Sequence, residues 1–243
     1  ILLSVASGEV HAISLAGSLL WRREVPGSIS APPILAHRGL VALGTREGRL
    51  FALSRDGALR WSVDLREPVT HLAATSDSFV AVAGGRRIVE VDSAGETRGS
   101  FELDGRLARL AVDRENRRLF LFHGGRFELE RGNGELLWSA PSVVGFLRLS
   151  EGVLLAMGEG RAELRSPSGR LLWELQSESP IRHMAPAGRG FAIVFRDWVV
   201  SWYAPDEARI TEAETGWGGW SSPRGGAAQN GAMPPASRLS EAE

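Results

Sequence analysis

The sequence predicts an all-β fold made of repeated antiparallel sheets, and three observations support this prediction. A segment of about 38 residues recurs along the chain with its glycine and apolar positions in register. Each copy alternates short apolar stretches with glycine-containing dipeptides that suit tight hairpin turns. Glycine is also frequent, with 29 residues in 243, against roughly 7% in average proteins, which indicates many turns.

The repeat is clearest in its first two copies. The stretch from Gly8 to Trp21 returns from Gly48 to Trp61 with an offset of 40 residues throughout. Looser copies contain the segments 87–95, 126–138, 161–173 and 197–206. The turn glycines of the first five copies recur 35 to 40 residues apart, at Gly17, Gly57, Gly95, Gly134 and Gly169. Self-similarity at such a spacing is the sequence signature of a repeat architecture.

Each copy is expected to form four strands. The segment before the turn glycine, such as 50–54 or 88–92, forms a hairpin with the segment that follows the glycine. A continuous apolar run precedes this hairpin, as at 39–44 and 79–83, and is typical of a strand buried on both faces. Another apolar segment precedes that run, as at 69–74. Four short antiparallel strands repeated six times predict a β-propeller of six blades, because radial closure hides the sheet edges.

The predicted blades account for residues 1–215. Their boundaries are expected near 1–25, 29–64, 68–103, 106–139, 142–176 and 181–213. The first blade lacks a segment for its first strand, which would leave a sheet edge open. We expect residues 231–239 to complete it, because Met233-Pro234-Pro235 echoes Ala31-Pro32-Pro33 of the second blade. The tail, residues 216–243, is therefore predicted to dock on the propeller and to help close the first blade.

The glycine and tryptophan positions resemble those of the PQQ-like, or quinoprotein-type, β-propeller family. The pattern Gly-x-Val/Leu-x-Ala-Ile/Leu-Ser-x-x-Gly-x-x-x-Trp occurs twice, at 8–21 and 48–61, and the resemblance spans about residues 1–231. It includes the family's tryptophan-docking motif, in which the tryptophan packs between neighbouring blades. The resemblance thus implies a structural docking role for Trp21, Trp61, Trp138 and Trp173. Gly99 stands where the third blade should carry its tryptophan, so we expect a weaker contact there.

The segment 216–231 carries Trp217 and Trp220 among many glycine, serine and proline residues. It resembles a leader that precedes the first blade in the same family, although here it comes late in the chain. Its composition alone predicts an irregular loop anchored by the two tryptophans. Two interpretations stay open, a structural plug and a loop that binds a partner.

The sequence gives no support to catalysis. The chain has no cysteine, which excludes disulfides, thiolate nucleophiles and Cys-type metal sites, and we find no phosphate-binding loop, dinucleotide fingerprint or hydrolase elbow. The quinoprotein dehydrogenases of the family imply a quinone cofactor and a calcium ion, but this chain shows six apparent blades and lacks the cysteine pair common among them. We expect no catalytic residue, cofactor or metal; a degenerate PQQ-dependent dehydrogenase is the alternative.

Charge and hydropathy limit the partners. The formal net charge of −1 means that a nucleic acid or an anionic membrane would need a local basic patch. The longest stretches without a charged residue, 25–37 and 225–237, have 13 residues each, short of the roughly 20 that a membrane-spanning helix needs. We expect other proteins as partners, no nucleic acid, and no transmembrane segment.

One repeated feature predicts a binding face. The turn between the second and third strands carries arginines in five successive blades, namely Arg46, Arg49, Arg86, Arg87, Arg126, Arg161 and Arg196. Equivalent turns lie on one face of a propeller, where guanidinium groups could bind carboxylates or phosphates. The neighbouring connections carry acids that would neutralise part of this face, namely Glu24, Asp64, Glu67, Asp104 and Glu178. Solvated turn arginines without a partner are the simpler interpretation, and it stays open.

The family also has non-enzymatic members, such as the propeller lipoprotein of the bacterial outer-membrane assembly machine. The resemblance to these members implies a non-catalytic scaffold for protein–protein interaction in a larger envelope assembly. It also implies an extracytoplasmic setting, periplasmic or associated with the envelope. A propeller that senses a small ligand or an anion is the second interpretation.

Overall fold

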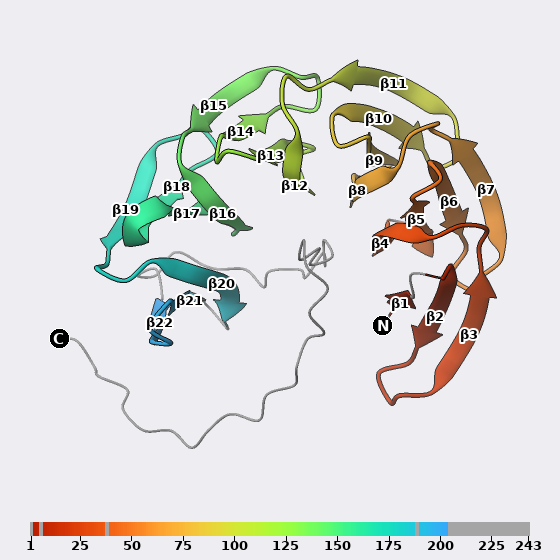
Figure 1. The fold of residues 1–243 in the computed structure, drawn as a ribbon, viewed down its shortest axis with the longest axis horizontal. Coiled ribbons are helices and arrows are strands. Elements are labelled where there is room, and N and C mark those ends of the chain that lie inside the picture. Colours follow the sequence, from red (N-terminus) through yellow and green to blue (C-terminus); the bar gives the residue numbers. More distant parts are fainter. Residues whose placement is uncertain (1, 5–6, 37–38, 188–189, 204–243) are drawn as a thin grey trace.

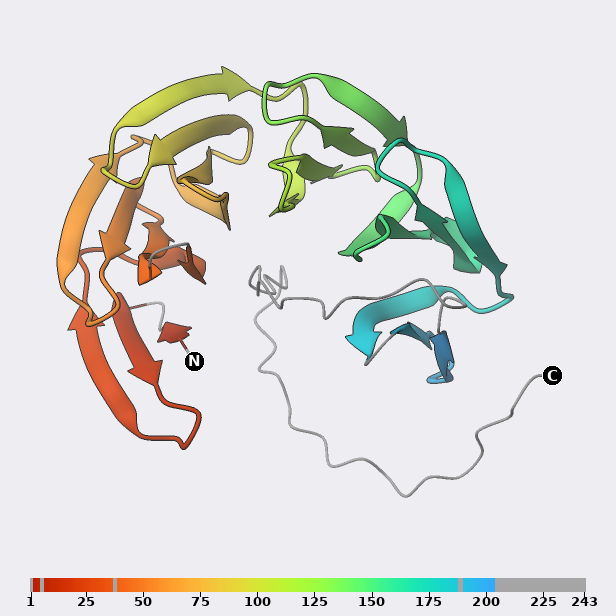
Figure 2. The ribbon, with the colours of Figure 1, turned by 180° about the vertical axis from the view of Figure 1, so that it is seen from behind.

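The computed structural model describes residues 2–4, 7–36, 39–187 and 190–203. These residues form antiparallel sheets that fan around a common axis, with no α-helix among them (Figure 1). The view from behind shows the same arc of sheets, in chain order (Figure 2). The predicted all-β propeller is thus confirmed. The described part of the chain supplies six sheets, and the number of blades in the closed ring stays a prediction.

Four sheets consist of four strands that follow one another in the chain. Sheet 2 contains β4 (Ile29–Leu35), β5 (Val41–Thr45), β6 (Arg49–Leu53) and β7 (Leu59–Asp64). Sheet 3 contains β8 (Val69–Ala74), β9 (Ser78–Ala83), β10 (Arg87–Asp92) and β11 (Thr97–Glu102). Sheet 4 contains β12 (Leu107–Val112), β13 (Arg118–Phe122), β14 (Phe127–Glu130) and β15 (Leu136–Ala140). Sheet 5 contains β16 (Val143–Arg148), β17 (Val153–Met157), β18 (Arg161–Arg165) and β19 (Leu171–Gln176), with the short 3-10 turn η2 (Gly158–Gly160) before β18.

The first and last sheets have three strands each among the described residues. Sheet 1 contains β1 (Leu2–Ser4), β2 (Glu9–Ile13) and β3 (Leu19–Glu24). Sheet 6 contains β20 (Ile181–Ala187), β21 (Gly190–Phe195) and β22 (Val200–Tyr203). The predicted completion of the first blade by residues 231–239 and the predicted docking of Trp217 and Trp220 lie outside the described residues.

Burial follows the position of a strand within its sheet. In sheets 2 to 5 the first strand lies nearest the axis and the fourth lies on the outside (Figure 1). The second strands β5, β9 and β13 are buried at every residue, whereas the outer strand β11 is exposed at every residue. The middle strands are covered by neighbouring sheets on both faces, which explains their continuous apolar sequences.

The hydrophobic core lies between the sheets. One cluster joins side chains of sheets 2 and 3, including Leu50, Val69 and Phe79. The two sheets approach closely at Gly44, where a Cβ atom would lie 2.3 Å from the side chain of Val69. A larger residue at position 44 would therefore push the sheets apart. Similar clusters join sheet 3 to sheet 4, sheet 4 to sheet 5, and sheet 5 to sheet 6.

Tryptophans of the outer strands contact the hairpin of the following sheet. Each indole Nε1–H donates to the carbonyl oxygen two residues before the next turn glycine: Trp21 to Arg55 at 2.7 Å, Trp61 to Ser93 at 3.0 Å and Trp138 to Pro167 at 3.1 Å. The indole also lies against that glycine, since a Cβ on Gly57, Gly95 or Gly169 would stand 2.7 to 2.9 Å from it. These contacts support the predicted docking role.

Trp173 belongs to the same series, but the hairpin that would follow it lies outside the described residues. Its ring packs edge-on against Phe191 at 5.4 Å and Tyr203 at 5.1 Å between centroids. Both partners belong to sheet 6, so this tryptophan also contacts the next sheet.

Polar side chains of the innermost strands join neighbouring sheets. Ser30 Oγ donates to the carbonyl oxygen of Val69 at 2.7 Å, and Arg109 Nη1 donates to that of Phe146 at 2.7 Å. His71 Nε2 lies 3.1 Å from the carbonyl oxygen of Ala108, so it carries the hydrogen in this contact. Burial lowers the pKa of His71 below its ordinary value of 6.5, and the bond to the carbonyl opposes this only in part.

Replacing Trp61 tests the role of the indole contacts. Trp61→Phe removes the hydrogen bond to Ser93 and is expected to lower the free energy of unfolding by about 1 kcal/mol, and Trp61→Ala by about 3 kcal/mol. Trp202→Phe is the matched control, because Trp202 is 55% exposed and its indole donates to Ala187 within its own sheet. Urea unfolding measures the three changes; an effect of Trp61→Phe no larger than that of Trp202→Phe would contradict the docking role.

His71 predicts how stability depends on pH. Because its pKa is lower in the folded chain than in the unfolded chain, the unfolded chain binds more protons below pH 6.5. The contribution of neutral His71 to the free energy of unfolding is therefore fully present above pH 6.5, and it decreases as the pH falls toward the folded pKa. His71→Gln keeps a donor for Ala108 but does not titrate, so its Tm should fall less than that of the wild type between pH 7.5 and 5.5. His183→Gln, on the exposed part of β20, is the control, and equal slopes for all three proteins would refute the assignment.

Candidate interaction surface

The turns that carry the predicted arginines lie on one face of the propeller. In sheets 2 to 6 the turn between the second and third strands is bonded to the connection that leads into the sheet. The backbone N–H of Arg46 donates to Ser28 at 2.8 Å, and the same bond recurs from Gly84 to Pro68 and from Arg196 to Pro180, each at 2.9 Å. Turns and connections are therefore adjacent, and basic side chains of the turns face acidic side chains of the connections. We call this surface the turn face.

Two turn arginines are paired with acids of the connections. Arg87 Nε donates to Glu67 Oε1 at 3.0 Å, and its guanidinium also bonds to the carbonyl of Leu65. Arg126 holds Asp104 with both terminal nitrogens, one of them at 2.9 Å, and its guanidinium lies 4.2 Å above the ring of Phe122. The hydrogen bond from Arg126 lowers the pKa of the Asp104 carboxyl. These two arginines are thus neutralised within the chain.

Arg161 is paired with acids of its own sheet. Its guanidinium contacts Glu163, and its Nε lies 2.9 Å from Glu174. Glu163 is only 1% exposed and also accepts a hydrogen bond of 2.6 Å from Arg165. Burying a carboxylate is costly unless cations compensate it. Arg161 therefore compensates the charge of the buried Glu163 in sheet 5, although it lies on the turn face.

The remaining turn arginines are exposed: Arg46, Arg49, Arg86 and Arg196. Arg86 Nη2 lies 3.4 Å from the carbonyl of Leu103, a long hydrogen bond. Within the described ranges, the guanidinium groups of the other three form no ion pair or hydrogen bond. The sequence thus placed the arginines on turns of one face, but only the structure separates the paired groups from the unpaired ones.

The structure shows no built metal site in the part of the chain that it describes. No three His, Asp or Glu side chains gather there in a way that could hold a metal ion. Likewise, no helix among the described residues has the length and apolar character needed to cross a membrane.

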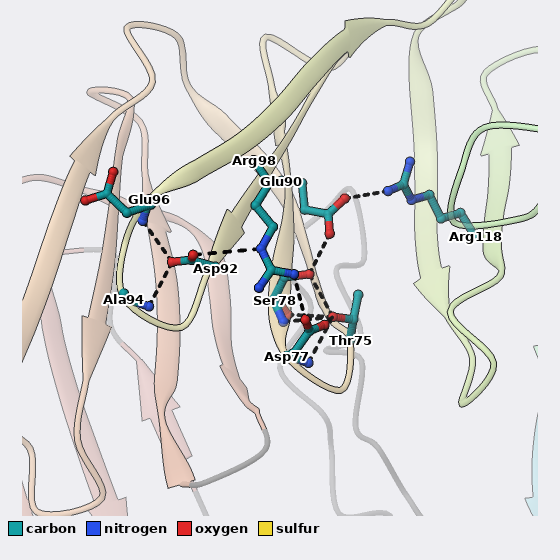
Figure 3. Close-up of polar contacts among 9 residues, drawn as sticks. All are labelled: Thr75, Asp77, Ser78, Glu90, Asp92, Ala94, Glu96, Arg98 and Arg118. Carbon is teal, nitrogen blue, oxygen red and sulfur yellow. Dashed lines mark hydrogen bonds and ion pairs between the residues drawn. The ribbon is translucent and has the colours of Figure 1, made fainter.

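Sequence reasoning missed an ion pair between sheets 3 and 4. Arg118, at the start of β13, donates through Nη2 to Glu90 Oε2 of β10 at 2.7 Å (Figure 3). Glu90 also accepts a hydrogen bond of 2.8 Å from Ser78, so its carboxylate has a partner on each side. Arg118 is 5% exposed, and its guanidinium lies 5.5 Å above the ring of Phe101.

This ion pair occurs at the one sheet boundary where Gly99 replaces the tryptophan. Glu90 pairs with Gly99 across the strands β10 and β11, whereas Ala52 pairs with Trp61 at the equivalent place of sheet 2. The only sequence feature that could have pointed to this ion pair was therefore the missing tryptophan at position 99 of the repeat. The predicted weaker contact at Gly99 is supported in that a Cβ there would have no heavy atom within 4 Å.

A groove of about 650 Å³ lies at this boundary, and we call it the Gly99 groove. The walls come from β10 and β11 of sheet 3 and from β13 to β15 of sheet 4. Its apolar lining includes Phe101, Leu103 and Leu136, and its floor includes the hairpin 132–134. Its carboxylates are Glu90, Glu102, Asp104, Glu128 and Glu130, against one lining arginine, Arg118.

Two of these carboxylates are partly desolvated. Burial raises the pKa of Glu128, and Arg126 opposes the rise. Burial also raises the pKa of Glu130, and the neighbouring charge of Glu128 adds to the rise. The Oε2 atom of Glu130 is buried without a hydrogen-bond partner in the described structure. Five carboxylates against one arginine in its lining make the Gly99 groove favour positive charge.

Comparison with known proteins agrees with the fold and indicates a family. Residues 6–141 match the family described as outer membrane protein assembly factor BamB. BamB of Yersinia pestis is 26% identical over 188 residues, which cover 76% of this chain and 43% of that protein. The chain thus spans less than half the length of this curated relative.

Two solved structures share the fold at low identity. BBS1N in complex with ARL6DN, soaked with lead, has a TM-score of 0.67 and 11% identity, over 84% of this chain and 74% of that chain. The C-terminal WD40 domain of Sif2 has a TM-score of 0.64 and 17% identity, over 84% of this chain and 63% of that chain. These likenesses support the β-propeller fold alone.

A double-mutant cycle tests the ion pair of Glu90 and Arg118. Glu90→Gln removes the hydrogen-bonded counter-ion of the buried guanidinium and should lower the free energy of unfolding by roughly 2–3 kcal/mol, somewhat less than for a fully buried pair. Arg118→Met added to Glu90→Gln should restore part of this loss, giving a coupling of about 1 kcal/mol or more. The exposed pair of Arg131 and Glu135, at 2.8 Å, is the control and should couple by less than about 0.5 kcal/mol. Equal coupling in the two pairs would show that burial of Arg118 has no energetic consequence.

Proposed function

The chain belongs to the family described as outer membrane protein assembly factor BamB, and from this premise we propose that it is a non-catalytic β-propeller scaffold that binds other proteins in a bacterial envelope assembly. The matched residues 6–141 extend from sheet 1 through sheet 4. The name of the Yersinia relative supports outer membrane protein assembly as the process. An extracytoplasmic place of action follows from the same relationship and belongs to the proposal.

The observation that carries the proposal is the turn face with its unpaired guanidinium groups. Sheet packing fixes the turns, since each is bonded through its backbone to the preceding connection. Arg46, Arg49 and Arg196 lie exposed on these turns without an internal ion pair, among the described residues. Guanidinium groups form paired, directional hydrogen bonds with carboxylates. A rigid display of such groups suits an acidic surface of a partner protein.

The turn face works as a platform because it holds its shape without the partner. Arg87 and Arg126 are already committed to Glu67 and Asp104. These pairs brace the turns and keep the local charge near neutral, so that the exposed arginines provide the positive charge. Binding of this kind should weaken with salt, because exposed charges are screened over about 8 Å at physiological ionic strength.

Two sets of arginine substitutions test the platform. The first set, Arg46→Gln, Arg49→Gln and Arg196→Gln, removes the unpaired groups. The matched control set, Arg87→Gln, Arg126→Gln and Arg161→Gln, removes the same charge from paired positions. Tagged full-length chain is isolated from the envelope fraction of the organism that encodes it, and co-purified outer membrane assembly proteins are quantified.

We expect the first set to reduce co-purification at least tenfold and the control set to reduce it less than threefold, with circular dichroism verifying that both fold. The salt dependence of capture should be lost only in the first set. Capture that survives the first set, or capture of cytosolic proteins alone, would refute the proposed platform.

A further inference from the structure

The sheet boundaries of this propeller share a recurring receptor for an indole ring. At three boundaries the receptor consists of the carbonyl two residues before the turn glycine, at Arg55, Ser93 or Pro167, together with that glycine. The glycines that receive the ring have φ angles of +83°, +94° and +84°. The donor indole comes from the outer strand of the preceding sheet, namely Trp21, Trp61 or Trp138.

The hairpin of sheet 4 keeps the receptor but receives no indole from the described part of the chain. Gly134 is its turn glycine, with φ of +87°, and Gly132 supplies the carbonyl two residues earlier. A Cβ on Gly134 would have no heavy atom within 4 Å, in contrast to the tight indole contacts of Gly57, Gly95 and Gly169. The residue that would fill the receptor is Gly99, and it too faces open space. The receptor side of the docking contact is therefore present at this boundary, and no described side chain covers it.

The ion pair of Glu90 and Arg118 holds sheets 3 and 4 together without filling the receptor. Both residues line the Gly99 groove, and about 650 Å³ of space remains beside them. The walls include the ring of Phe101 from sheet 3, 37% exposed, and the side chain of Leu136 from sheet 4, 51% exposed. Aromatic rings pack well against such walls and gain most when their N–H finds an acceptor.

The charge of the groove indicates what should flank the indole. Five carboxylates and one arginine line it, and one of the carboxylates, Glu130, has a buried oxygen with no hydrogen-bond partner in the described structure. Asp104 and Glu128 lie near Arg126 on the turn-face side, whereas Glu102 forms no ion pair within the described part of the chain. Basic groups beside the ring would therefore be attracted, and acidic ones repelled.

We propose that the Gly99 groove binds a tryptophan side chain of a partner protein, flanked by basic residues, which docks where the chain lacks its own tryptophan. The indole N–H donates to the carbonyl of Gly132, the ring lies against Gly134, and the basic flank faces Glu130 and Glu102. The inference rests on the proposed function in that both describe a protein-binding propeller, but it concerns an outer groove and not the turn face.

The test uses the full-length chain and the peptide acetyl-Gly-Arg-Trp-Arg-Gly-amide with fluorine on its indole, followed by fluorine NMR. Saturable binding is expected, at least tenfold weaker when alanine replaces the peptide's tryptophan or when glutamates replace its arginines. Glu130→Gln should weaken binding of the basic peptide severalfold. Absence of binding, or binding that does not depend on the indole, would overturn the proposal.

Filling the groove from within supplies an independent readout. Gly99→Trp restores the tryptophan to its position in the repeat and should raise the Tm by roughly 2 °C or more, while weakening peptide binding at least tenfold. Ser62→Trp is the matched control, because Ser62 is exposed on the outer strand β7 and does not line the groove. It should leave both the Tm and peptide binding nearly unchanged. Unaltered binding to Gly99→Trp would place the peptide elsewhere and refute the groove.

A variant of the tail tests whether the groove binds a tryptophan of a partner or one of the chain's own tryptophans. If the peptide binds only after Trp217→Ala and Trp220→Ala, the groove is occupied by this chain itself and the proposal fails. Equal binding with and without these substitutions supports a partner. If the chain does not bind the peptide but still captures envelope proteins through the turn-face arginines, only the groove proposal is refuted. If the chain binds the peptide but capture does not depend on those arginines, only the turn-face platform is refuted.

Discussion

Burial of the middle strands between neighbouring sheets is the constraint on which the rest of this structure depends. A strand such as β9, buried at all six residues, cannot be exposed on either face without losing the free energy of apolar burial. Each sheet therefore needs a neighbour, and the neighbours must approach closely, as Gly44 and Val69 do. Most polar groups then lie at the axis, on the outer strands or in the turns, and charged groups of the middle strands, such as Arg118 and Glu163, are paired. The candidate interaction surfaces lie in two of these three places.

The outer strands need a separate device, because they have no sheet beyond them to bury against. In three places a tryptophan bridges to the next hairpin and satisfies its N–H there, which joins apolar contact to a directional bond. Between sheets 3 and 4 the chain uses a charge pair instead, placed one strand deeper at Glu90 and Arg118. The exchange keeps the sheets joined but leaves the outer receptor uncovered. A structural substitution in a repeat can thus leave open a receptor that a tryptophan covers in sheets 2, 3 and 5.

Much of this fold can be predicted from the sequence, because the repeat constrains it several times over. The alternation around Leu50 to Ser54, the turn glycine Gly57 and the tryptophan at 61 each indicate the same hairpin. Local chemistry still shifts details. Pro32 and Pro33 have no N–H to donate, and the pairing of β4 with β5 accordingly skips from Ala31 to Ile34.

The candidate sites could be predicted only in part. The recurrence of arginine on equivalent turns places those residues on one face, and the interrupted register at Gly99 marks an unusual boundary. Which arginines are neutralised depends in large part on contacts between residues 20 or more apart, such as Arg87 with Glu67 and Arg126 with Asp104. Those contacts follow from the stagger between sheets, which no local pattern encodes.

The division of the arginines bears on how a repeat protein acquires a specific partner. A ring of equal, unpaired charges would attract any polyanion and would select poorly, because long-range attraction carries little geometric information. Here Arg87 and Arg126 are bound internally, so the free guanidinium groups are few and separated by neutral turns. In the proposed platform, a partner must match particular positions and not simply the sign of the charge. Specificity would then come from departures from the repeat, at the turn face and at the Gly99 groove, while the repeat itself supplies the frame that holds them in place.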